Sequence, residues 1–190
     1  MENSTRKLIK NSIKYWYLPL VLGIVFIIVG IWVSNTPLSS YLTLSFLFAF
    51  TFLIGGIIEI IYALSNRNST ESWGWLLASG ILGLLLGILL IANLSISMIV
   101  LSLYVGFWIL FYSIIGIGRS IDLKKYSSKR WGYLMFTSIL GLILSLIIIW
   151  NPLFGGLTIV FYTALAFIIL GALNIVLAFE LRKLYKELYD

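Results

Sequence analysis

The stretch WGWLLASGILGLLLGILLIA, from Trp73 to Ala92, contains no charged side chain. A helix needs roughly 20 apolar residues to cross the hydrocarbon core of a bilayer, and this stretch has that length. Polar and apolar residues do not alternate along it, as they would in a half-buried strand. The stretch therefore predicts a membrane-spanning α-helix.

The whole chain has the same character. Of its 190 residues, 61% are hydrophobic and 11% are charged, whereas an average soluble chain has about a quarter charged residues. The runs are too long and too uniform for soluble strands or for a membrane barrel. We expect an all-α integral membrane protein, one membrane domain over 1–190, with six spans at about 15–34, 40–64, 73–92, 97–121, 131–150 and 156–181.

The first run follows a basic start, as the apolar part of a signal peptide does. However, it is about 20 residues long, and it ends in Ser34-Asn35-Thr36-Pro37 rather than in a small-x-small cleavage site. These features favour a retained transmembrane helix.

Positive charge lies on one side of the predicted membrane. The links 35–39, 93–96 and 151–155 carry no charge. All 13 Lys and Arg residues lie before span 1, between spans 2 and 3, around the connection of spans 4 and 5, or after span 6. By the positive-inside bias, we expect both termini to be cytoplasmic.

The sequence also repeats itself. Trp16, Trp73 and Trp131 open spans 1, 3 and 5, and Gly56 corresponds to Ser113 and Gly171. The unit is a helical hairpin of about 57 residues, and its three copies are roughly 15–64, 73–121 and 131–181. Each copy crosses the membrane twice, so the copies share one orientation. Any symmetry axis is then a pseudo-threefold along the membrane normal.

The repeat carries a family resemblance. Each hairpin opens with Trp. Small residues seven positions apart recur among the copies, and so does a turn with the sequence Asn-Pro or Thr-Pro. A Gly-x-x-x-Ile-x-x-Ala pattern, as in Gly171 to Ala178, closes the hairpin before a basic stretch. Nearly the whole chain resembles the HdeD-like family. That resemblance implies a bacterial inner-membrane protein linked to acid resistance, and it provides no catalytic residues to carry over.

The composition excludes several chemistries. The chain has no Cys and no His, which removes thiol catalysis, disulfides and the usual zinc, copper and haem ligands. We expect no cofactor, no metal site and no nucleic-acid partner. Few acids lie near the cytoplasmic face, among them Glu59, Glu71, Asp122 and Glu180, so an enzyme acting on lipid is the least favoured class.

Small residues follow one face of the odd-numbered spans. Their heptad or i, i+4 spacing allows helix backbones to approach closely in lipid. They form either an intramolecular packing surface or a homo-oligomer interface. The residues are Gly23, Gly30, Gly80, Gly83, Gly87, Ser138, Gly141 and Ser145.

The remaining aromatic and basic residues indicate membrane anchoring. Trp16, Trp73 and Trp131 lie where spans meet the cytoplasmic headgroups, so we interpret them as interfacial anchors rather than as a ligand cage. The segment from Thr5 to Trp16 has one apolar face and one basic face. It is either an interfacial helix on anionic lipid headgroups or only a topology signal.

Glu59 is the unusual charge inside a span. It lies about 7 Å along the helix from the cytoplasmic end of span 2. The repeat places Gly116 and Asn174 at the same depth, and Arg119 lies one turn away from Gly116. We expect Glu59, Arg119 and Asn174 to converge. Glu59 would either pair with Arg119 or reach headgroup water, or the three would form a proton-responsive or substrate-binding cluster.

Two functional hypotheses follow. The first is a non-enzymatic membrane protein that supports envelope or acid-stress tolerance. The second is a small transporter or proton-responsive channel, although the outer halves of the spans carry only scattered polar residues such as Thr43, Ser102 and Thr158. A permanent aqueous pore needs a more continuous polar lining.

Overall fold

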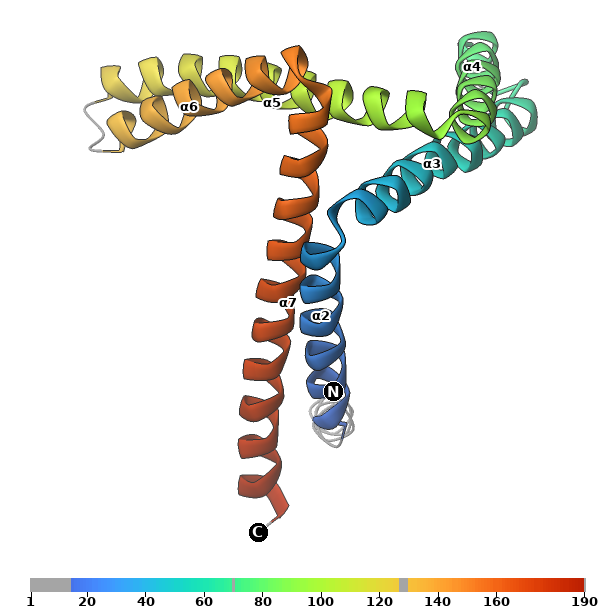
Figure 1. The fold of residues 1–190 in the computed structure, drawn as a ribbon. Helices are drawn as coiled ribbons and strands as arrows, with labels where there is room; N and C mark the ends of the chain where they lie inside the picture. Colours follow the sequence, from blue (N-terminus) through green and yellow to red (C-terminus); the bar gives the residue numbers. More distant parts are fainter. Residues whose placement is uncertain (1–14, 70, 127–129, 190) are drawn as a thin grey trace. The chain divides into compact units, whose positions relative to one another are not determined.

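The computed structural model describes residues 15–69, 71–126 and 130–189 (Figure 1). The described chain is all-helical. Its helices are α2 (Tyr17–Asn35), α3 (Pro37–Ser65), α4 (Trp73–Ala92), α5 (Leu94–Lys125), α6 (Trp131–Trp150) and α7 (Pro152–Tyr189). Most of the predicted interfacial segment Thr5–Trp16 lies outside the described residues.

All six helices are long and apolar enough to cross a membrane. This confirms the prediction of a multi-pass helical membrane protein. The helices α4 and α6 have the predicted bounds, whereas α3, α5 and α7 begin three or four residues earlier than predicted.

The difference arises at the uncharged links, each of which is one residue long. Thr36, Asn93 and Asn151 are the non-helical residues between consecutive helices, and each backbone N–H bonds the carbonyl four residues earlier. The next helix then starts at once. Two of the three starts are prolines, Pro37 and Pro152, and proline is favoured at the first position of a helix. We call the helix ends at these links the short-link ends, and the opposite end of each helix its charged-loop end.

The chain forms two compact units. One contains residues 1–37 and 160–190, and the other contains residues 38–159. The prediction of a single membrane domain stays a prediction, and each unit is described by itself.

In the first unit, α2 packs against α7 through small residues. Gly23 and Gly30 are buried on α2, and they lie opposite Gly171 and Ala164 on α7. A Cβ atom added to Gly23 would lie 2.7 Å from the carbonyl oxygen of Gly171. The two backbones are therefore in direct contact, which is the close approach that small residues permit in lipid.

In the second unit, α3 packs against α4 in the same way. Gly80 and Gly87 are buried on α4 and face Gly56 and Leu53 of α3. A Cβ atom on Gly87 would lie 2.5 Å from the backbone nitrogen of Leu53. We call this contact the α3–α4 seam.

The α5–α6 seam contains buried serines as well as glycines. Ser138 and Ser145 are buried on α6, and Ser113 and Ser120 are buried on α5. The hydroxyl of Ser120 crosses the seam and donates a hydrogen bond of 2.7 Å to the carbonyl oxygen of Trp131. Figure 1 shows α5 and α6 side by side along this seam.

The three seams use corresponding positions. A buried small residue recurs every seven residues on α3, α5 and α7 because a heptad step returns to nearly the same helix face. These residues are Ala49, Gly56 and Ala63; Gly106, Ser113 and Ser120; and Ala164, Gly171 and Ala178. The small faces are thus used within the chain. Each seam joins an odd-numbered span to an even-numbered span from a different predicted hairpin.

A buried polar junction connects α3, α5 and the start of α7 at their short-link ends. The Tyr41 hydroxyl lies 2.6 Å from Ser102 Oγ and also donates to the Met98 carbonyl. Ser102 donates to the Pro152 carbonyl at 2.7 Å. The Tyr41 ring lies against Gly156, where a side chain would collide with it. We call these contacts the Tyr41 junction.

Candidate functional site

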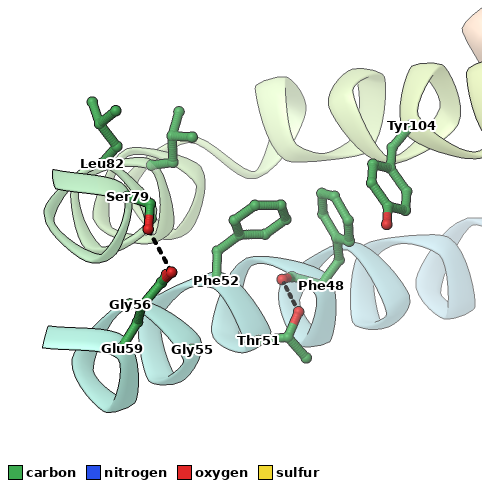
Figure 2. A pocket seen from close by; sticks show the side chains of 11 residues that line it. Phe48, Thr51, Phe52, Gly55, Gly56, Glu59, Ser79, Leu82 and Tyr104 are labelled. Atoms are coloured by element: carbon green, nitrogen blue, oxygen red, sulfur yellow. Dashed lines mark hydrogen bonds between the residues drawn. The ribbon is translucent and has the colours of Figure 1, made fainter. Parts of the chain in front are cut away.

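A groove of about 600 Å³ opens beside the α3–α4 seam. Figure 2 shows its lining side chains, which come from α3, α4 and α5 of the second unit. The lining residues are Phe48, Thr51, Phe52, Gly55, Gly56, Glu59, Ser79, Leu82, Gly83, Leu86 and Tyr104. The lining is therefore mainly apolar and aromatic, with one carboxylate.

The α3 wall follows from helical spacing. Phe48, Phe52, Gly55 and Glu59 are three or four residues apart, so they lie along one face of α3. Phe48 stands between two aromatic neighbours. Its ring centroid is 5.0 Å from that of Phe52 and 5.4 Å from that of Tyr104 on α5. These tilted and edge-to-face arrangements are the favoured geometries of aromatic pairs.

Glycine leaves the groove open. A Cβ atom added to Gly55 would meet nothing within 4 Å, whereas one added to neighbouring Gly56 would collide with the backbone of α4. Gly55 therefore lines empty space, and Gly56 allows the two helices to touch beneath it.

Glu59 and Ser79 form the polar end of the groove. Ser79 of α4 donates a hydrogen bond to Oε1 of Glu59, as the dashed line in Figure 2 shows. The same hydroxyl lies 3.1 Å from the Leu76 carbonyl oxygen of its own helix. A hydroxyl has one proton and two acceptor sites, so Ser79 can donate to only one of these partners at a time.

The structure gives Glu59 a different partner from the one predicted. Arg119 is exposed, and among the described residues no ion pair joins it to Glu59. Gly116, which corresponds to Glu59, packs against Ser138 in the α5–α6 seam. Asn174 belongs to the first unit, where its amide donates to the Leu170 carbonyl at 2.8 Å. The convergence of Glu59 with Asn174 stays a prediction.

The predicted packing residues have two environments. Gly23, Gly30, Gly80 and Gly87 are buried in seams. Gly83 and Gly141 are half-buried at seam edges, and Gly83 also lines the groove.

Two of the predicted tryptophan anchors lie beside cations at the charged-loop ends. The Arg182 guanidinium is 5.0 Å from the ring centroid of Trp16, and the Lys124 ammonium is 4.9 Å from that of Trp131. Trp73 is partly exposed. Such cation–π contacts place positive charge next to the aromatic rings.

Sequence reasoning did not find Ser79 or the Tyr41 junction. Ser79 is a single serine in an apolar run, and serine in membrane helices commonly bonds only its own backbone. A signal for the junction was present in the repeat, because Tyr41, Met98 and Gly156 are equivalent positions. One copy has a tyrosine at this position and another copy has a glycine. Such a pair indicates that the tyrosine ring occupies the space that the glycine leaves free.

Comparison with protein families gives a match over most of the chain. A family model described as a short repeat of unknown function (DUF308) matches residues 21–92, 78–149 and 136–189. The three matches start 57 and 58 residues apart, which confirms the predicted repeat length. No curated protein and no solved structure matches the chain.

Proposed function

The chain belongs to the DUF308 short-repeat family, and from that premise and the groove we propose a non-enzymatic ligand-binding function in the bacterial inner membrane. The ligand is an amphiphile dissolved in the bilayer, and its binding supports envelope or acid-stress tolerance. The stress role rests on the resemblance to the HdeD-like family. The orientation, with both termini cytoplasmic, rests on the positive-inside bias.

The groove is the single observation that carries this proposal. Ligand sites are concave and mainly apolar, have volumes of about 300–1,000 Å³, and contain a few polar groups that orient the ligand. The α3–α4 groove has about 600 Å³, an aromatic wall and one carboxylate held by a serine. Within the described residues, no group of three or more His, Cys, Asp or Glu side chains could hold a metal ion.

The Glu59–Ser79 pair can be hydrogen-bonded with the carboxyl group either ionised or protonated. When Glu59 is ionised, it accepts the proton of Ser79, as in the structure. When Glu59 is protonated, it can donate to Ser79, whose own proton then turns to the Leu76 carbonyl 3.1 Å away. Both states of the carboxyl group are hydrogen-bonded, so neither leaves a polar group unsatisfied.

The same pair favours one alternative, a small proton-responsive transporter. A carboxylate within a membrane span commonly marks an ion or proton pathway. The lining beyond Glu59 and Ser79 is mainly apolar, however, which suits a bound amphiphile better than a conducted ion. Proton flux into proteoliposomes that contain the protein distinguishes the two, because a binding protein produces no flux above that of empty vesicles.

The lipid bilayer itself is a proposed partner. Lys124 and Arg182 lie beside tryptophans at the charged-loop ends, where anionic headgroups would attract them.

A complementation experiment tests the proposal. A bacterial strain without the gene is expected to survive acid exposure less well, and the wild-type gene is expected to restore survival. Gly55→Leu fills the groove without changing a charge, so it should fail to restore survival at equal membrane abundance. Glu71→Gln removes an exposed acid outside the groove and should restore it. Full rescue by Gly55→Leu would contradict a role for the groove.

A further inference from the structure

We infer that the occupant of the α3–α4 groove is an organic cation that partitions into the membrane, with its charge at Glu59 and its apolar body along the aromatic wall. This inference rests on the proposed binding function, and it specifies the chemical class of the ligand.

Charge complementarity is the first argument. Glu59 is the charged residue among those lining the groove, and no Lys or Arg lines it. Ser79 donates its hydrogen bond to Oε1 of Glu59, and the other carboxylate oxygen, Oε2, makes no hydrogen bond to Ser79. A carboxylate in an apolar surrounding is costly unless it is protonated or paired. A positive ligand supplies the missing counter-charge, whereas an anion would be repelled.

The shape of the groove is the second argument. From Phe48 to Glu59 the wall extends over eleven residues of helix, or about 16 Å. Phe48, Phe52 and Tyr104 form a continuous aromatic surface at one end, and the carboxylate stands at the other. Aromatic faces attract apolar groups and also cations that lie within about 6 Å. The groove therefore suits a body that is mainly apolar and bears a single charge.

The corresponding surface of α7 provides an internal comparison. A smaller groove of about 330 Å³ is lined by Tyr162, Thr163, Ala166, Phe167 and Leu170. Four of these residues correspond to Phe48, Thr51, Phe52 and Gly55 of α3. Leu170 stands in place of Gly55, and no acidic residue lines this groove. A lipid chain could lie in either groove, but only the α3–α4 groove contains a carboxylate to select a cation.

Two probes of the same shape and opposite charge test the inference. The full-length protein in detergent micelles is dialysed against tetraphenylphosphonium, a cation, and separately against tetraphenylborate, an anion. We expect saturable binding of the cation and none of the anion. Glu59→Gln should weaken cation binding roughly tenfold to a hundredfold, which is the usual range for loss of a charged partner. Gly55→Leu should weaken it as well, and Glu71→Gln should not.

The outcomes separate this inference from the proposed function. Equal binding of both probes, weakened by Gly55→Leu but unaffected by Glu59→Gln, would overturn the cation and leave a groove that binds amphiphiles. Absence of saturable binding for both probes would overturn both proposals. Cation binding that survives Gly55→Leu would place the site elsewhere and overturn the inference.

Discussion

The α3–α4 and α5–α6 seams are formed by corresponding positions of the repeat, but they pack in different ways. In the α3–α4 seam, Gly56 and Gly87 bring backbone against backbone. In the α5–α6 seam, a Cβ atom on Gly116 or Gly141 would meet the hydroxyl of a serine instead. One seam is a direct helix contact, and the other contains a layer of serine side chains.

The two seams also differ at the repeat position that Glu59 occupies. Its equivalent on α5 is Gly116, which is buried against Ser138. Where α3 has an acid, a groove lies beside the seam, and where α5 has glycine, the position belongs to the packing itself. The repeat thus fixes which helices can pack, and single substitutions within it decide whether a seam closes or has a binding surface.

The largest effect is expected at Gly56. In Gly56→Ala the new methyl group would lie 2.7 Å from the Gly80 carbonyl oxygen, and backbone atoms cannot move away without separating the helices. We expect a loss of about 3 kcal/mol in the free energy of unfolding, at the upper end for overpacking. Unfolding in mixed detergent micelles measures it. The adjacent Gly55→Ala meets open space, so it should be neutral or stabilising by up to about 1 kcal/mol. Equal losses in the two variants would remove the distinction between seam and groove.

A smaller loss of stability, which a second substitution should restore, is expected in the α5–α6 seam. Gly116→Ala places a methyl group against the side chain of Ser138, whose Cβ would be 3.2 Å away. We expect a loss of about 2 kcal/mol. Ser138→Gly removes the obstructing atoms, so the double variant should recover much of that loss in a double-mutant cycle. Additive losses would show that the two seams do not differ as the structure indicates.

The connection between the two seams gives the third prediction. Tyr41→Phe keeps the ring against Gly156 but removes the hydroxyl, whose one proton can go to the Met98 carbonyl oxygen or to Ser102 Oγ. Hydrogen bonds within membrane proteins contribute about 0.6 kcal/mol on average and up to about 1.7. We expect a loss of about 1 kcal/mol in the free energy of unfolding. Tyr112→Phe, at an exposed tyrosine, serves as the control and should change nothing. Equal stability of Tyr41→Phe and wild type would mean that the Tyr41 junction does not couple α3 to α5.

Much of this architecture follows from the sequence, and its limits have physical causes. Long apolar runs determine the six spans, and small residues seven apart identify the faces that pack, because both signals are local. The pairing of helices is not local: glycine on α4 can pack against any helix with a matching small face. The sequence therefore predicts the small face of α4 without predicting that it meets α3. The partner of Glu59 was missed for the same reason, since the repeat indicates depth along a helix but not which neighbour lies beside it.

The smallest effect on stability is expected for Glu59 and Arg119, the two charged residues that the sequence predicts to lie together. Were Glu59 and Arg119 a buried ion pair, removing one partner would cost roughly 3–5 kcal/mol. In the structure, Glu59 is bonded to Ser79 and Arg119 is exposed. The amide of Glu59→Gln retains an oxygen that can accept from Ser79, and the substitution leaves no other side chain without a counter-charge, so we expect no loss of stability greater than about 0.5 kcal/mol. Arg119→Gln should have an equally small effect, and the double variant should be additive within roughly 0.3–0.5 kcal/mol. A coupling energy above that range would show that the two side chains meet. The carboxylate would then already have a counter-charge, and the groove would lose its reason to bind a cation.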